Sequence, residues 1–214
     1  VLEMLGDVKD KRVLEAGCGT GYMARLIAQR GASVFGIDAH EEALQLARTR
    51  GPQTITYRPA RIELGIPYCN RSCIDVITLV SVLVYNDLQA GKAIIKELAR
   101  VAKGGAILVL SEPHPALLRK DNGWVTYIPD TRMANSGRKD YYDQFYRNVS
   151  GAQDWTPLTR PKSCAEIWGM LNQEGWEIQE MREPVVTKEV ISKGTMWGED
   201  YGYPGYLQIK AVRK

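Results

Sequence analysis

The segment 13–21, with the sequence VLEAGCGTG, constrains the fold of this chain more than any other. An apolar run typical of a strand enters a glycine-rich turn, and a helical pattern leaves it. The glycines alternate along the turn: Gly17, Gly19 and Gly21. They allow close approach of a ligand to the backbone, because no Cβ stands in the way. The next apolar run, 33–37, ends in Asp38, at the spacing where open α/β folds place a carboxylate on a ribose. These features predict a nucleoside site.

Two residues indicate which kind of nucleoside the turn would hold. A dinucleotide site has the pattern GxGxxG, whose third glycine is replaced here by Tyr22, and it directs a helix N-terminus at a pyrophosphate. Glu15, two residues before Gly17, would repel a pyrophosphate but suits a ligand with an ammonium and a sulfonium. Both observations disfavour a nicotinamide dehydrogenase. The segment resembles motif I of the class I S-adenosylmethionine-dependent methyltransferases, an acidic residue followed by GxGxG.

The resemblance extends along the chain. The segment 66–68 (IPY) followed by Ile74-Asp75 is similar to the family's "LPF…FD", and 97–105 (ELARVAKGG) is similar to its "E-hydrophobic-x-R-hydrophobic-x-K-x-GG". The chain most resembles the small-molecule methyltransferases of the ubiquinone and menaquinone type (type 11), many of which work in natural-product pathways. The resemblance implies S-adenosylmethionine as cofactor and S-adenosylhomocysteine as product. The residues it implies for cofactor binding are Glu15, Gly17, Cys18, Gly19, Gly21, Asp38, Ala39, Arg61, Ile62, Leu79 and Val80.

One position departs from the family pattern. Arg61 stands where an acidic residue usually hydrogen-bonds the adenine amino group. The backbone N–H of Ile62 can serve the adenine ring instead, and Arg61 either stacks on the ring or faces solvent. Leu79 and Val80 are expected to offer backbone groups or packing to the methionine portion of the cofactor.

The order of the patterns predicts an α/β fold: a doubly wound, Rossmann-like, seven-stranded sheet. The resemblance implies that its last strand is antiparallel and lies beside the sixth. The expected strands are 13–16, 33–37, 54–57, 75–80, 106–110, 176–181 and 206–211. The expected helices include 40–50, 92–103 and one that starts at a capping box, 163–166. We expect a single domain, 1–214, with a cofactor half (1–111), a lid or acceptor insertion (112–162) and a C-terminal part (163–214).

The insertion after the fifth strand is aromatic and polar and lacks a long periodic helix. A stretch of this length without regular elements is typical of a functional lid. We expect its tyrosines Tyr141, Tyr142 and Tyr146 to contact a small, partly aromatic or apolar acceptor. The alternative interpretation is an aromatic satellite core beneath a long loop.

Three residues are candidates for proton transfer. His114 lies just past the fifth strand, at the edge where open α/β sheets bind substrate, and it could accept a proton or orient the acceptor. Glu112 is a second candidate and Tyr85 a third. The DPPY motif used on exocyclic amines of nucleobases is absent, because 79–82 reads LVSV. A non-methyl-transfer activity such as a cyclase, and a non-catalytic subunit that binds the cofactor and stabilises a partner, remain alternatives.

Composition limits the remaining classes. The net charge of +3 is too small, and the basic residues too dispersed, to predict nucleic-acid binding. No apolar run reaches the roughly 18–20 residues of a membrane span, and no signal-peptide pattern is present. The four cysteines have no zinc-site spacing and no metal site is expected; we interpret them as free thiols in a reducing cytoplasm. The expected partner is a small-molecule acceptor, and the expected assembly a monomer or homodimer.

Overall fold

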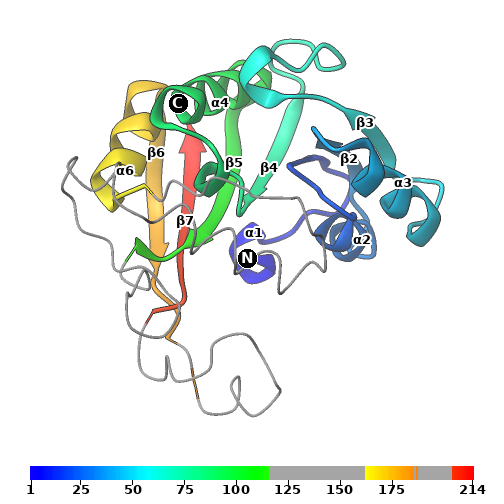
Figure 1. Ribbon diagram of the computed structural model, residues 1–214, viewed down its shortest axis with the longest axis horizontal. Coiled ribbons are helices and arrows are strands. Elements are labelled where there is room, and N and C mark those ends of the chain that lie inside the picture. Colours follow the sequence, from blue (N-terminus) through cyan, green and yellow to red (C-terminus); the bar gives the residue numbers. More distant parts are fainter. Residues whose placement is uncertain (116–161, 186, 188–203) are drawn as a thin grey trace, which may run out of the picture.

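The computed structural model describes residues 1–115, 162–185, 187 and 204–214 (Figure 1). In this part of the chain seven strands form one sheet, in the order β3-β2-β1-β4-β5-β7-β6. The strands are β1 (Arg12–Ala16), β2 (Ser33–Asp38), β3 (Thr56–Pro59), β4 (Ile74–Val80), β5 (Ala102–Pro113), β6 (Trp176–Arg182) and β7 (Tyr206–Arg213). The α-helices are α1 (Leu2–Leu5), α2 (Tyr22–Ala28), α3 (Glu41–Arg50), α4 (Leu88–Val101) and α6 (Cys164–Gln173). Two short 3₁₀ helices are η1 (Ile62–Leu64) and η2 (Leu83–Tyr85).

The strand pairing confirms the predicted fold class. Strands β1 to β5 are parallel to one another, and β7 runs antiparallel to both β5 and β6. The sheet order turns back between β1 and β4, which are adjacent although β2 and β3 separate them in sequence. Such a reversal leaves a crevice at the carboxyl ends of the two strands, where open α/β sheets bind their ligands.

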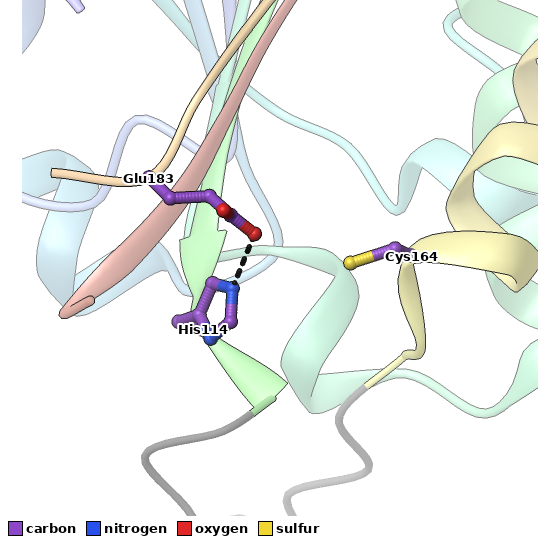
Figure 2. Close-up of side chains that lie close together, drawn as sticks. All are labelled: His114, Cys164 and Glu183. Carbon is purple, nitrogen blue, oxygen red and sulfur yellow. Dashed lines mark hydrogen bonds and ion pairs between the residues drawn. The ribbon is translucent and has the colours of Figure 1, made fainter. Parts of the chain in front are cut away.

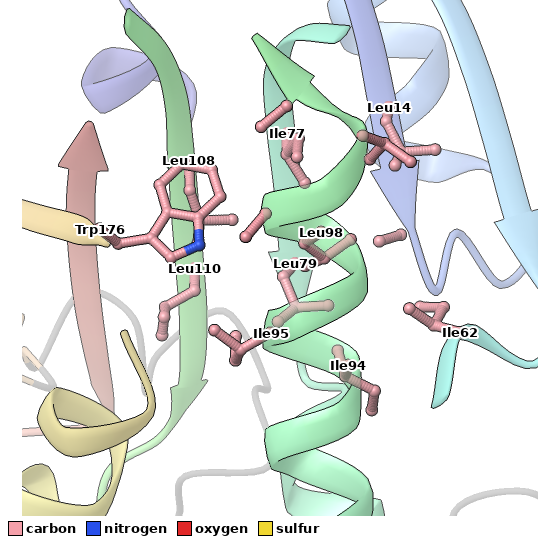
Figure 3. Packing of buried hydrophobic residues seen from close by; sticks show 14 of the residues in the cluster. Leu14, Ile62, Ile77, Leu79, Ile94, Ile95, Leu98, Leu108, Leu110 and Trp176 are labelled. Atoms are coloured by element: carbon pink, nitrogen blue, oxygen red, sulfur yellow. The ribbon is translucent and has the colours of Figure 1, made fainter. Parts of the chain in front are cut away.

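Helices cover both faces of the sheet and create two hydrophobic clusters. One cluster joins the strands to α4 and α6, and the other joins them to α1, α2 and α3. In the first, Ile95 and Leu98 of α4 pack over Leu79 of β4 and Leu110 of β5 (Figure 3). The central strands are therefore buried on both faces, as their continuous apolar sequences predict.

Helix α4 differs from its predicted bounds of 92–103. It begins one turn earlier, because the side chain of Asp87 caps it by accepting a hydrogen bond from Ala90 N–H at 2.8 Å. It ends at Val101, and β5 starts at the next residue. The glycine pair that we expected to stop the helix lies inside β5, where the register shifts against β4 and Gly105 has a φ of 80°. Strand β5 therefore takes up Ala102 and Lys103, the last two residues of the predicted helix, and its register irregularity follows Ala102.

The C-terminal elements follow the prediction closely. Ser163 and Glu166 form a reciprocal capping box at the start of α6. Strand β7 lies between β5 and β6, with Leu207, Ile209 and Ala211 fully buried. No helix within the described ranges combines the length and the apolar character needed to cross a membrane. The thiols of Cys18, Cys69, Cys73 and Cys164 are all free.

Candidate cofactor and acceptor site

The glycine turn joins β1 to α2, and all three glycines have left-handed backbone conformations. Their φ angles are 75° at Gly17, 49° at Gly19 and 73° at Gly21. A Cβ at Gly17 would lie 2.3 Å from the side chain of Val82, and a Cβ at Gly21 would lie 2.4 Å from the hydroxyl of Tyr57. A Cβ at Gly19 would meet no protein atom within 4 Å. Gly17 and Gly21 therefore allow the backbone to pack, whereas Gly19 presents bare backbone to open space.

Asp38 joins the end of β2 to this turn. Its Oδ2 accepts the N–H of Gly19 at 2.7 Å, and its Oδ1 accepts the N–H of His40 at 2.9 Å. The backbone N–H groups of Gly17 and Cys18 also donate to the carbonyl of Ile37 in β2. Oδ1 also lies 3.1 Å from Nδ1 of His40. The Asp38 side chain is therefore held in one orientation at the carboxyl edge of the sheet, and its Oδ2 retains a further lone pair for a ligand hydroxyl.

A cavity of about 600 Å³ opens at this edge, within the range of small-molecule sites. Its wall combines the glycine turn, the end of β2, the segment around η1 and the loop after β4. The lining residues are Gly17, Gly19, Asp38, Ala39, His40, Ala60, Arg61, Ile62, Glu63, Ser81, Val82, Tyr85, Asn86 and Ile94. An elongated nucleoside fits this arrangement, because bare backbone at Gly19 and a fixed carboxylate at Asp38 meet in one crevice.

The wall around η1 contains an acidic side chain beside Arg61. The Arg61 guanidinium lies 2.6 Å from Oε1 of Glu63, and its side chain is 66% exposed while that of Glu63 is 17% exposed. Ile62 between them is buried. The arginine is therefore neutralised within the wall, and Glu63 supplies a carboxylate two residues after the position where the family pattern places one.

Glu15 lies within the fold behind the glycine turn. It is 4% exposed, and burial raises its pKa to about 8, an effect partly offset by a backbone hydrogen bond at Ala24 and by the charge of Arg25. Among the described residues its Oε2 has no hydrogen-bond partner. It does not line the cavity. Its link to the elements of the turn is therefore the backbone hydrogen bond at Ala24 in α2, and with this pKa the side chain is largely protonated at neutral pH.

The loop after β4 is held by a buried carboxylate from β5. Glu112 accepts the backbone N–H groups of Val82, Leu83 and Val84 at 2.9 to 3.0 Å. Burial raises its pKa to about 7, against the opposing effect of these hydrogen bonds. The ammonium of Lys162 donates to the carbonyl of Leu83 at 2.8 Å and also to that of Asn86. The position of this loop is therefore fixed by hydrogen bonds to both its N–H groups and its carbonyls.

His114 lies beyond the end of β5 and is 7% exposed. Its Nε2 lies 2.9 Å from Oε1 of Glu183, and Cys164 at the start of α6 is the third member of the group (Figure 2). The ligand-type atoms of these three residues lie within 4.8 Å of one another. Sequence reasoning singled out His114 but neither Cys164 nor Glu183 as its neighbours, because no local spacing links them.

The predicted site residues divide into three groups. Those that line the cavity are Gly17, Gly19, Asp38, Ala39, Arg61, Ile62 and Tyr85. Those outside the lining are Glu15, Cys18, Gly21, Leu79, Val80, Glu112 and His114. Tyr141, Tyr142 and Tyr146 lie outside the described residues. At the end of β4 the wall is formed by Ser81 and Val82 instead of Leu79 and Val80. Residues just past a parallel strand face the crevice, and that rule could have identified both.

Comparison with known proteins agrees with this architecture. Residues 14–110 match a family model described as a methyltransferase domain. The ubiquinone biosynthesis O-methyltransferase of Hahella chejuensis is 38% identical over 104 residues, which cover 47% of this chain and 42% of that protein. The demethylmenaquinone methyltransferase of Tropheryma whipplei is 37% identical over 116 residues, covering 53% of this chain and 46% of that protein. The matched part of the chain thus spans less than half the length of these two relatives.

Solved structures share this fold. An S-adenosylmethionine-dependent methyltransferase from Mesorhizobium loti aligns with a TM-score of 0.76 and 24% identity, covering 99% of this chain and 95% of that one. The fold is therefore that of the class I S-adenosylmethionine-dependent methyltransferases. Residues 14–110 are thus similar to a methyltransferase domain, and the relatives that share this similarity include ubiquinone and menaquinone enzymes.

Proposed function

We propose that this protein transfers a methyl group from S-adenosylmethionine to a small-molecule acceptor. The observation that carries the proposal is the cavity at the β1–β4 reversal, where the open backbone of Gly19 and the carboxylate of Asp38 lie together. In this assignment Asp38 holds the ribose hydroxyls, the N–H of Ile62 or the Glu63 carboxylate serves the adenine, and the glycine turn holds the methionine portion. The bound cofactor supplies an electrophilic methyl group carried by its sulfonium sulfur. The rest of the cofactor is the leaving group and departs as a neutral thioether.

The acceptor end of the site is assigned to the loop after β4. Tyr85 and Asn86 line the cavity on the side toward β5, and Glu112 and Lys162 fix the backbone that carries them. Placing two reactants in line contributes much of the catalysis in a displacement with a good leaving group. The name of the ubiquinone biosynthesis O-methyltransferase favours O-methylation, and we assign a hydroxylated aromatic acceptor, in quinone formation or in specialised metabolism. His114 is assigned to receive or orient the acceptor proton.

Calorimetry with S-adenosylhomocysteine tests the cofactor assignment. We expect micromolar binding, about −8 kcal/mol, to the unaltered protein and no detectable binding of NADH. Gly19→Ala should weaken binding at least roughly tenfold, because its Cβ enters the space that the ligand occupies. Gly6→Ala is the matched control, since Gly6 also has a positive φ and open space around its Cβ but lies outside the cavity.

A screen of hydroxylated aromatic acceptors with labelled cofactor then tests the transfer itself. Preference for NADH over S-adenosylhomocysteine would refute the proposal. Cofactor binding without transfer to any acceptor would instead favour the alternative of a non-catalytic or non-methyl-transfer member of the fold.

A further inference from the structure

A histidine, a cysteine and a glutamate meet where three elements end or begin. His114 follows β5, Glu183 follows β6 and Cys164 is the first residue of α6. Their imidazole, carboxylate and thiol are directed toward one another, and their ligand-type atoms all lie within 4.8 Å of one another (Figure 2). Within the described residues this is the one group of three histidine, cysteine, aspartate or glutamate side chains gathered so closely. None of the three lines the cofactor cavity.

The backbone of all three segments is held by hydrogen bonds. The N–H of His114 donates to the carbonyl of Gly205 at 3.1 Å, and the N–H of Gly205 donates to the carbonyl of Pro184, next to Glu183, at 2.9 Å. Cys164 directly follows the N-cap residue that forms the capping box of α6. The sheet and the helix cap therefore bring the three side chains together before any ligand binds, which lowers the conformational cost of binding one.

The types of the three side chains indicate which cation they would bind. Thiolate sulfur, imidazole nitrogen and carboxylate oxygen are the ligands of protein zinc sites. Magnesium and calcium instead prefer oxygen ligands throughout. Three protein ligands also leave one tetrahedral position for water or another group. The set therefore suits zinc or a transition metal with similar preferences.

The distances require only a small adjustment. Nε2 of His114 and Oε1 of Glu183 are 2.9 Å apart, a hydrogen-bond distance. Two nitrogen or oxygen ligands of a tetrahedral zinc ion lie roughly 3.3 Å apart, and a sulfur ligand lies roughly 3.6 Å from either. The imidazole is 9% exposed and the Glu183 side chain 54%. The carboxylate can therefore turn outward while the ring stays in place, and this exposed side gives a cation a path from solvent.

We propose that His114, Cys164 and Glu183 form a binding site for zinc or a divalent transition metal of similar ligand preference. On binding, the cation replaces the proton between Nε2 and Oε1, the imidazole binds as its neutral tautomer with the proton on Nδ1, and the thiol releases its proton to solvent. The inference does not depend on the proposed function, because the site lies outside the cofactor cavity. A bound cation occupies Nε2, so the proton role assigned to His114 above belongs to the metal-free protein.

Metal content and cobalt spectroscopy test the site directly. The full chain without a histidine tag, incubated with zinc and then passed through gel filtration, should retain one zinc ion per chain. Cobalt(II) in place of zinc should give a thiolate charge-transfer band, because Cys164 supplies a sulfur ligand. Retention of no zinc, or cobalt binding without this band, would overturn the inference.

A pair of cysteine variants shows which thiol binds. Cys164→Ala should abolish the band and weaken zinc binding at least roughly a hundredfold, since even the loss of a ligand's own hydrogen-bond partner costs about 10–100-fold. Cys73→Ala is the matched control, because Cys73 is also a free thiol but lies outside the group. A band that persists in Cys164→Ala, or that is lost in Cys73→Ala, would contradict the assignment.

A second pair of variants changes only exposed or partly exposed side chains, so that the fold is not at risk. Glu183→Gln should weaken zinc binding at least roughly tenfold, because the amide is a poorer ligand than the carboxylate. Glu180→Gln, at a partly exposed carboxylate of β6 that pairs with Arg182, should bind zinc like the unaltered protein. Equal affinities of the two variants would remove Glu183 from the site and overturn the three-ligand assignment.

Thermal unfolding gives a readout that needs neither a spectrum nor activity. Zinc at about a hundred times its dissociation constant should raise the melting temperature by roughly 5–10 °C, because the cation binds only the folded arrangement. An equal rise in His114→Ala would show that zinc binds elsewhere and would overturn the inference. Calorimetry with S-adenosylhomocysteine on the zinc-free protein tests the proposed function separately, so failure of one proposal is distinguishable from failure of the other.

Discussion

Lys162 donates a hydrogen bond to the carbonyl of Leu83 across 79 positions of sequence. The side chain is 6% exposed and lies near the Glu112 carboxylate, which binds the N–H groups of the same loop. The buried ammonium of Lys162 thus binds the carbonyls of this short loop, and the buried carboxylate of Glu112 binds its N–H groups. Because this segment carries Tyr85 and Asn86, the rigidity of the acceptor end depends on contacts made far from it in sequence.

Lys162→Met should destabilise the protein and loosen the loop. We expect the free energy of unfolding to fall by about 1–3 kcal/mol, because two carbonyls lose a buried donor and Glu112 loses its nearby positive charge. Denaturant unfolding measures the change, and Lys92→Met on the exposed face of α4 provides the control. Equal stability of the two variants would contradict the role given to Lys162.

Asp38→Ala should weaken S-adenosylhomocysteine binding by about 1.5–3 kcal/mol, the magnitude of hydrogen bonds to a charged acceptor. Part of this loss comes from the turn, since Gly19 N–H also loses its acceptor. Calorimetry gives the difference. The control is Glu42, an exposed carboxylate at the start of α3. The variant Glu42→Ala should bind S-adenosylhomocysteine as tightly as the unaltered protein does.

Stability should decrease as the pH rises from about 4.5 to about 8. Burial raises the pKa of Glu15 to about 8 and that of Glu112 to about 7, so the folded protein holds protons that the unfolded chain releases at lower pH. These groups therefore contribute stability that is fully present below pH 4.5 and is lost as the pH rises through their folded-state pKa values.

The variant Glu15→Gln isolates one contribution to this trend. It does not ionise, so its melting temperature should fall less between pH 5 and 8 than that of the unaltered protein. Thermal scans across this range measure both slopes. Equal slopes in the two proteins would show that Glu15 is already ionised near pH 5.

Replacement of Tyr142 or Tyr146 by Ala should raise the KM for the acceptor while S-adenosylhomocysteine affinity stays almost constant. The reason is the apolar area that tyrosines offer to a planar ligand. Steady-state kinetics and calorimetry separate the two ligands. Equal losses for both would support the alternative of an aromatic satellite core.

The parts of the fold that could be predicted are those encoded locally. Continuous apolar strands, the alternate glycines and the Ser163 capping box each depend on neighbours within a few residues, and the structure contains all three. The predicted end of α4 was wrong, because pairing of Ala102 with Ile74 across the sheet overrides the helical periodicity of the sequence. Pairing between strands distant in sequence decides where such a helix ends, and the helical pattern of the sequence carries no information about that pairing.

The candidate site divides in the same way. Asp38 follows a strand at a known spacing and could be placed from the sequence. The partners of Glu112 and His114 could not, because both pairings arise where strands or loops distant in sequence meet. A single sequence records no such pairing. The contact of Glu183 with the imidazole of His114 depends on β7 lying between β5 and β6.

That placement of β7 has a consequence for synthesis on the ribosome. When residues up to 185 have emerged, β5 has β4 on one side and an unpaired edge on the other, and β6 has no strand beside it. Only when 206–213 follow can both edges be paired and Leu207, Ile209 and Ala211 be buried. Exposed strand edges promote association between chains. The nascent protein therefore passes through a stage in which β5, the longest of the seven described strands, is open to aggregation, and β7, which ends this stage, is the last of the seven to be made.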